Sequence, residues 1–174
     1  MSQPNRIFEL LRESGGQDSL ADQAEVVKLA GMIEQIERNI GRSLQFYANE
    51  SRLTLLEAQA LAAVLQLDEH ARLSAIAEYV RMPLSTMTGV AARLEKSGLV
   101  ERKRATDDGR ASILSLTEEG TARILSMFRP FFAEVSKVIE QAGSGTMQSV
   151  IDSFTIVNEM AEQLVARVDS KKQG

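Results

Sequence analysis

The sequence predicts a mainly α-helical protein with one small β-hairpin, and three observations support this fold class. Apolar residues recur every three or four positions over several long stretches, which is the period of one helix face. Two short helical patterns meet at Pro83, as they do in a helix-turn-helix. After Gly98 the pattern changes to two short strands around the polar tip 106–109. This order predicts a winged helix-turn-helix domain, in which the hairpin is the wing.

The N-terminal part is predicted to be a short appendage followed by a long helix. Residues 1–19 form the appendage, because they end in a linker-like run of Ser, Gly and Asp. The helix lies within residues 20–50, from Leu20 to Tyr47. Its apolar side chains are spaced by three and four residues: Val26, Leu29, Ile33, Ile36, Ile40, Leu44 and Tyr47.

The winged domain is predicted over residues 51–120. It opens with a second helix, because Thr54 and Glu57 have the spacing of a capping box. It closes with the hairpin, whose strands are expected at 99–105 and 111–117.

Between these elements lies the helix-turn-helix. One short helix is expected from Ser74 and the next from residue 84 to 97, where Gly98 stops it. Pro83 separates the two, because its ring suits a first helical turn and disfavours helical geometry before it. The inward face of the helix over 84–97 carries Met87, Val90, Ala91 and Leu94.

The C-terminal part, residues 121–170, is predicted to hold the remaining helices. One begins near Thr117, passes Pro130 and stops at Gly143–Gly145. The last helix has an apolar stripe close to a heptad seam: Met147, Ile151, Phe154, Val157, Ala161, Leu164 and Val168. The winged domain is therefore expected between N-terminal and C-terminal helices that bury apolar stripes.

Composition excludes several kinds of site. The chain has 174 residues, of which 25% are charged and 44% hydrophobic, and it has no Cys and a single His. Without Cys it has no disulfide, thiolate metal site or thiol nucleophile, and one His makes a multi-histidine metal site untenable. We expect no metal and no cofactor. No window approaches the ~20 apolar residues of a membrane span, so a cytoplasmic location is expected.

Charge is unevenly distributed along the chain. The formal net charge is −4, which argues on average against a nucleic-acid partner. Residues 81–110, however, carry seven Lys and Arg against four Asp and Glu, a balance of +3, while the other residues sum to −7. This cluster is either a basic recognition surface or a chance cluster on a solvated face.

The ordered motifs resemble those of the MarR (multiple antibiotic resistance regulator) transcription factors. The likeness is carried by Leu73–Ala77, by Arg93–Arg102, by Asp108-Gly109-Arg110 and by Leu114–Gly120, and it extends over about residues 25–168. Two positions depart from the family pattern. Gly109 stands where the wing often has Arg, and Gly89 stands where many relatives have Arg.

The resemblance implies a DNA-binding surface built from the helix over 84–97 and the wing. A helix in the major groove would present the outward residues Ser85, Thr86, Thr88 and Gly89 to base edges. For the hydroxyl residues the alternative is helix-start chemistry. For Gly89 one interpretation is a close approach of the helix backbone to DNA, and the alternative is a position with low steric demand.

The arginines have more than one candidate role. Arg93 is placed to contact a phosphate or guanine, or else forms a surface ion pair with Glu95 or Glu101. In the wing, the resemblance implies that Arg110 enters the minor groove and that Asp108 holds its guanidinium. Arg102 and Arg104 share one face of the first strand and are favoured for phosphate contact.

The resemblance also implies an intertwined homodimer. Its seam would include Ile33, Ile36, Ile40, Phe154, Val157 and Leu164, although packing within one chain also explains part of this stripe. Two-fold symmetry predicts a pseudo-palindromic operator. Relatives have a cleft for small aromatic acids or related effectors, and its candidate lining here is Phe46, Tyr47, Met82 and Phe128, for which plain core packing is the alternative. Without Cys, a thiol-oxidation sensor is excluded.

These observations predict a regulator that binds DNA as a homodimer, a repressor by resemblance, which a small aromatic or phenolic effector releases. The alternative is a winged-helix module that binds proteins without DNA sequence specificity. An enzyme has no support, because the sequence has neither a Gly-rich phosphate loop nor a cluster of His and acidic residues.

Overall fold

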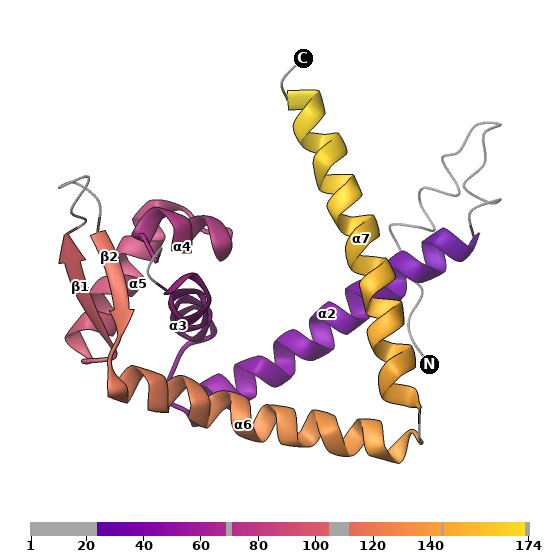
Figure 1. The fold of residues 1–174 in the computed structure, drawn as a ribbon, viewed down its shortest axis with the longest axis horizontal. Helices are drawn as coiled ribbons and strands as arrows, with labels where there is room; N and C mark the ends of the chain where they lie inside the picture. Colours follow the sequence, from indigo (N-terminus) through magenta and orange to yellow (C-terminus); the bar gives the residue numbers. More distant parts are fainter. Residues whose placement is uncertain (1–23, 69–70, 105–111, 144, 173–174) are drawn as a thin grey trace. The chain divides into compact units, whose positions relative to one another are not determined.

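The computed structural model describes residues 24–68, 71–104, 112–143 and 145–172. They are mainly helical with one antiparallel hairpin, which confirms the predicted fold class (Figure 1). The elements are α2 (Ala24–Glu50), α3 (Leu55–Leu67), α4 (Leu73–Tyr79), α5 (Leu84–Lys96), β1 (Val100–Arg104), β2 (Ser112–Leu116), α6 (Glu118–Gln141) and α7 (Thr146–Lys172). The chain divides into two compact units, and the boundary falls inside α6 after Met127. The predicted appendage, residues 1–19, lies outside the described residues.

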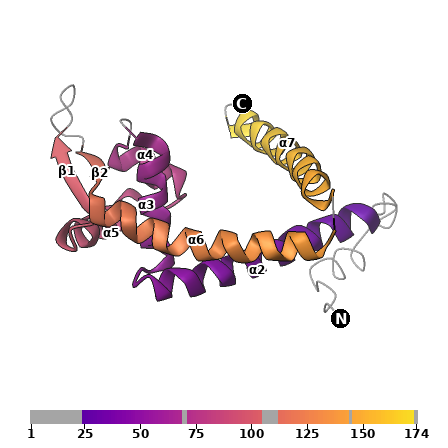
Figure 2. The ribbon, with the colours of Figure 1, turned by 60° about the horizontal axis from the view of Figure 1, so that its bottom comes forward.

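The core of the first unit forms around α3. This helix contacts α2, α4, α5 and β2, and α5 in turn lies beside β1 (Figures 1 and 2). Because α3 is surrounded, its side chains are apolar on nearly every side, and five of its residues are buried: Ala58, Ala60, Leu61, Ala63 and Val64. The other helices and the hairpin complete the core with Leu73, Ile76, Ala77, Met87, Val90, Ala91, Leu94, Val100, Leu114, Ile124 and Met127.

Three helices of the first unit end in the same backbone turn. After α5, the N–H of Leu99 donates to the Leu94 carbonyl at 2.9 Å, and Gly98 takes a φ of 70°. This pattern is the Schellman motif, in which Gly is favoured because it adopts positive φ without strain. The ends of α2 and α4 repeat it with Arg52 and Arg81, each at a φ of 57°. A non-Gly residue there costs about 1 kcal/mol, so two of the three turns carry backbone strain.

The hairpin has a third, very short partner that the sequence pattern did not predict. Strands β1 and β2 pair with Arg102 opposite Leu114 and Arg104 opposite Ser112. On the other edge of β2, the N–H of Leu114 donates to the Ala71 carbonyl at 3.0 Å, and Arg72 forms a bridge with Ile113. Two residues are too few to show a strand period in the sequence.

The hairpin is fixed to α6 by a close backbone contact. The hydroxyl of Thr117 donates to the Gly98 carbonyl at 2.6 Å and accepts the N–H of Gly120 at 3.0 Å, which caps the first turn of α6. Gly120 is buried, and a Cβ on it would lie 1.9 Å from the Leu99 carbonyl oxygen. Only glycine therefore allows α6 to pack this closely on the start of β1.

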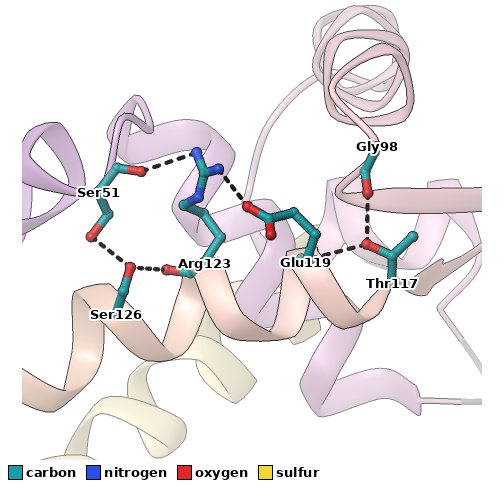
Figure 3. A network of polar contacts seen from close by, with 7 residues as sticks. Ser51, Gly98, Thr117, Glu119, Arg123 and Ser126 are labelled. Atoms are coloured by element: carbon teal, nitrogen blue, oxygen red, sulfur yellow. Dashed lines mark hydrogen bonds and ion pairs between the residues drawn. The ribbon is translucent and has the colours of Figure 1, made fainter.

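A polar network connects the turn after α2 to the same part of α6 (Figure 3). Arg123 forms an ion pair with Glu119 at 2.6 Å and its guanidinium lies 3.5 Å from the Ser51 carbonyl oxygen. The hydroxyl of Ser126 lies 3.2 Å from the hydroxyl of Ser51, which is buried. Buried polar groups cost stability unless they are paired, so this network allows Ser51 to occupy the interior of the first unit.

The second unit consists of α6 from Phe128 onward and α7. The two helices are separated by Gly143 and Gly145, whose φ values of 106° and 87° suit glycine, so the predicted stop is confirmed. None of the described residues in this unit is buried. The exposed apolar side chains of α7 are Met147, Ile151, Phe154, Ile156, Met160, Leu164, Val165 and Val168.

Candidate nucleic-acid interface

Helix α5 has one buried and one exposed face, as the spacing predicted. Its buried residues are Met87, Val90, Ala91 and Leu94, which pack into the core of the first unit. The candidate base-contacting residues Ser85, Thr86, Thr88 and Gly89 are all exposed. The structure thus brings the four candidates together on one accessible helix surface.

Helix α5 begins at Leu84, and Pro83 is its N-cap. Pro83 thus lies one position before the first helical turn, in which it was predicted to lie. No side chain caps this helix. The hydroxyls of Ser85 and Thr86 therefore do not perform the capping that was their alternative role. Thr88 does make a local contact, because its hydroxyl donates to the Leu84 carbonyl at 2.8 Å, a common bond within helices.

Arg93 forms an ion pair, but with neither of the partners expected from sequence. Its Nε donates to Glu57 Oε1 at 3.0 Å, whereas Glu95 and Glu101 had been the candidates. Glu57 lies in α3, 36 positions earlier in the chain, so only the packing of α3 against α5 brings the two together. A second donor of the guanidinium, Nη1, lies 3.4 Å from the Gly89 carbonyl oxygen.

Glu57 serves two partners at once. Oε2 accepts the N–H of Thr54 at 3.0 Å and the N–H of Glu57 donates to the Thr54 hydroxyl at 3.2 Å, which confirms the predicted capping box. Burial alone would raise the pKa of the Glu57 carboxyl, but the hydrogen bonds from Thr54 and Arg93 outweigh it, and the pKa lies below 4.5. Glu57 is therefore an anion that orients Arg93 along the exposed face of α5.

The first strand of the wing adds three exposed cations beside α5. Arg102, Lys103 and Arg104 are all exposed. The register places Arg102 and Arg104 on the same side of the hairpin, as expected, and Lys103 on the other, where it lies 3.8 Å from Glu101. Asp108 and Arg110, the predicted tip residues, lie outside the described residues.

The turn between α4 and α5 contributes a cation that the sequence analysis did not select. Arg81 is exposed and occupies the strained position of the Schellman turn. The signals available in the sequence were its place in the basic stretch 81–110 and its position two residues before Pro83, and Arg carries no preference for a positive φ. Arg81, α5 and β1 together form the candidate interface.

The candidate effector residues differ in exposure. Phe46 is exposed and its ring meets that of Tyr47 edge to face at 5.2 Å, while Tyr47 and Met82 are half-buried. Phe128, half-buried, belongs to the second unit, where its ring stacks on Phe132 at 5.7 Å.

Of the candidate seam residues, Ile40, Phe154 and Leu164 are exposed, and Ile33, Ile36 and Val157 are half-buried.

The described residues contain no group of three or more His, Asp and Glu side chains that would hold a metal ion. None of their helices has the length and apolar character needed to cross a membrane.

Comparison with known proteins identifies the fold. Residues 53–112 match the model of the MarR family. A Bacillus subtilis protein described as an uncharacterized HTH-type transcriptional regulator, YfiV, is 28% identical over 104 residues, which are 59% of this chain and 65% of the relative. The organic hydroperoxide resistance transcriptional regulator of the same organism is 37% identical over 71 residues, 40% of this chain and 48% of the relative. The chain thus spans less than two thirds of these curated relatives.

Solved structures share the fold over most of the chain. A MarR family transcription regulator, SP03579, superposes with a TM-score of 0.70 at 16% identity, over 84% of this chain and 97% of that one. A point mutant of S. aureus MepR, described as bound to an oligodeoxyribonucleotide, gives 0.55 at 14% identity, over 78% and 97% of the two chains. The central motifs, the family model and the shared fold agree: residues 53–112 are similar to the MarR family, and the fold is that of the winged helix-turn-helix MarR structures.

Proposed function

We propose that this chain is a transcriptional regulator that binds a pseudo-palindromic DNA operator as a homodimer and acts as a repressor. The observation that carries the proposal is the exposed face of α5, with Ser85, Thr86, Thr88 and Gly89, beside the cationic strand β1. A helix of this kind fits the major groove, while a neighbouring hairpin reaches the backbone and minor groove. The DNA-bound MepR structure supports the same use of this fold.

The charge pattern supports a DNA partner. The balance of +3 over residues 81–110 coincides with the turn, α5 and β1, and the −7 of the other residues opposes indiscriminate binding to phosphate. In this proposal Arg102 and Arg104 contact phosphates, and Arg110, held by Asp108, enters the minor groove. Arg93, already oriented by Glu57, reaches a phosphate beside α5.

The exposed apolar stripe of α7 supports the dimer. A single chain leaves Phe154 and Leu164 51% and 63% exposed, which is costly for side chains of this size. A second copy would cover them along a two-fold axis and place two α5 helices about one turn of DNA apart, roughly 34 Å. Residues Phe46, Tyr47, Met82 and Phe128 remain the candidates for a site where a small aromatic or phenolic effector releases the operator.

The test is binding to the promoter DNA beside the protein's own gene, measured over a range of salt concentrations. We expect preference over a scrambled duplex of the same length and composition. Affinity should fall steeply with salt, by a log–log slope of about −0.9 per phosphate contacted. A chain that shifts neither duplex, or both equally at every salt concentration, would favour the protein-binding alternative.

A wing variant tests the minor-groove contact. Arg110→Ala should weaken operator binding by about 1–3 kcal/mol without changing the dimer, because it removes one arginine contact from the predicted hairpin tip. The measurement is operator titration together with sedimentation analysis. Unchanged affinity would remove the wing from the mechanism.

A further inference from the structure

The exposed face of α5 has charges only around its ends. No Asp, Glu, Lys or Arg occurs from Leu84 to Ala92, whereas Arg81 precedes the helix and Arg93 and Lys96 occupy its last turn. Phosphate contacts position a protein on DNA, and contacts with base edges specify the sequence. The cations are thus placed to meet phosphates, while the residues at the start of α5 that would face the bases are uncharged.

Arg93 does not provide the start of α5 with a charged side chain that could contact the bases. A guanine is recognised by two parallel donors of an extended guanidinium. Here Nε already donates to Glu57 at 3.0 Å, and Nη1 lies against the Gly89 carbonyl oxygen at 3.4 Å. The first contact ties the side chain to α3 and the second to its own helix, which suits a phosphate contact and leaves the first turns of α5 without an arginine for guanine.

The first turns offer an aliphatic side chain instead. Leu84, the first residue of α5, is 52% exposed although it shares a side of the helix with the buried Met87 and Ala91 by helical spacing. The next two residues along the chain, Ser85 and Thr86, are exposed and carry hydroxyl groups. In the major groove the only apolar group on a base edge is the C5-methyl of thymine.

We propose that α5 selects thymine in each half-site, with Leu84 packing against the C5-methyl group. This inference rests on the proposed function, in which α5 enters the major groove. Leu84 acts as a specificity-determining residue through apolar contact, and Ser85 and Thr86 contact polar edges or phosphates next to it. Burying one methyl group corresponds to about a fourfold gain in affinity.

The experiment compares thymine with deoxyuridine, which lacks only the methyl group. The full chain is first used to select its preferred site from a random duplex library, and each dT of that site is then replaced singly by dU. We expect one thymine per half-site at which dU weakens binding about fourfold. Leu84→Ala should abolish that difference, while Leu65→Ala, which truncates an equally exposed leucine on α3, should leave it intact.

The outcomes separate this inference from the proposed function. Selective binding with no dU-sensitive thymine would overturn the inference and leave the regulator intact. A dU effect that persists in Leu84→Ala would assign the methyl contact to another residue and equally overturn it. If no sequence is selected and binding does not depend on salt, the proposed function fails, and the inference fails with it.

Discussion

The two units of this chain bury their apolar side chains to very different extents. In the first unit, Leu61, Ile76, Met87 and Leu94 are at most 2% exposed, and α3 is covered on nearly every side. In the described part of the second unit no residue is buried, and Phe154 and Leu164 stand more than half exposed. Side chains of this kind stabilise a fold only when they are covered. The first unit therefore carries its own core, whereas the apolar side chains of the second unit are not covered within that unit.

The most damaging change should fall at the contact between the hairpin and α6. Gly120→Ala would place a Cβ 1.9 Å from the Leu99 carbonyl oxygen, and neither backbone can move without breaking the Thr117 cap. We expect the free energy of unfolding of the first unit to fall by about 3 kcal/mol or more, as measured by denaturant titration. Gly31→Ala is the control, because nothing lies within 4 Å of that position on α2. Equal stability of the two variants would contradict the close packing at Gly120.

The second unit is tested through its exposed stripe. Phe154→Asp should raise the dissociation constant of the dimer about thirtyfold, equivalent to about 2 kcal/mol, because a charge replaces a ring that the partner would cover. Sedimentation equilibrium measures the dimer, and hydrogen exchange of α3 and α5 reports whether the first unit stays folded. Ser153→Asp adds the same charge one position away, off the stripe, and should leave the dimer intact. A dimer that survives Phe154→Asp would place the seam elsewhere.

Lowering the pH should reduce the stability of the first unit, because the Glu57 carboxylate becomes protonated. The pKa of Glu57 is lowered in the folded chain, so its stabilising contribution is present above pH 4.5 and is lost as pH falls through the lower folded-state value. Glu57→Gln should cost about 1 kcal/mol at neutral pH, because it weakens the hydrogen bonds with Thr54 and Arg93. The difference from the native chain should shrink at acidic pH in denaturant titrations. The exposed Glu78→Gln is the control, and a gap that stays constant with pH would disprove the assignment.

The smallest expected effect is a gain in the stability of the first unit. Gly89→Ala should raise the stability of the first unit by about 1 kcal/mol, since alanine favours the helix and the nearest atom to its Cβ, Arg93 Nη1, is 3.9 Å away. Thermal unfolding checks this gain. Operator titration of the same variant then separates two explanations: lost affinity identifies close approach of α5 to DNA, and unchanged affinity identifies a position with little steric demand. A loss of stability would contradict the open space at Gly89.

The helices were predictable from sequence where a local signal specified their ends. Gly98 stops α5 and the Thr54–Glu57 box starts α3, because each signal acts over only a few residues. The turns at Arg52 and Arg81 have the same geometry as that at Gly98, but arginine has no intrinsic preference for it. There the tertiary packing imposes the turn.

In the candidate site, too, only the features that follow from a local pattern were predictable from sequence. The exposed and buried faces of α5 follow from helical period alone, and the shared side of Arg102 and Arg104 follows from strand alternation. The partner of Arg93 did not follow, because Glu57 is 36 residues away and no local pattern connects them. The pairing of β2 with Ala71 and Arg72 was missed for the same reason.

The double role of the Glu57 carboxylate has a mechanical consequence. One oxygen is bonded to the first turn of α3 and the other to α5, so the two helices cannot slide far past each other without losing a hydrogen bond. The first unit should consequently meet DNA as a preassembled rigid body. In the proposed homodimer, any adjustment to operators with different half-site spacing would then have to occur outside the α3–α5 pair.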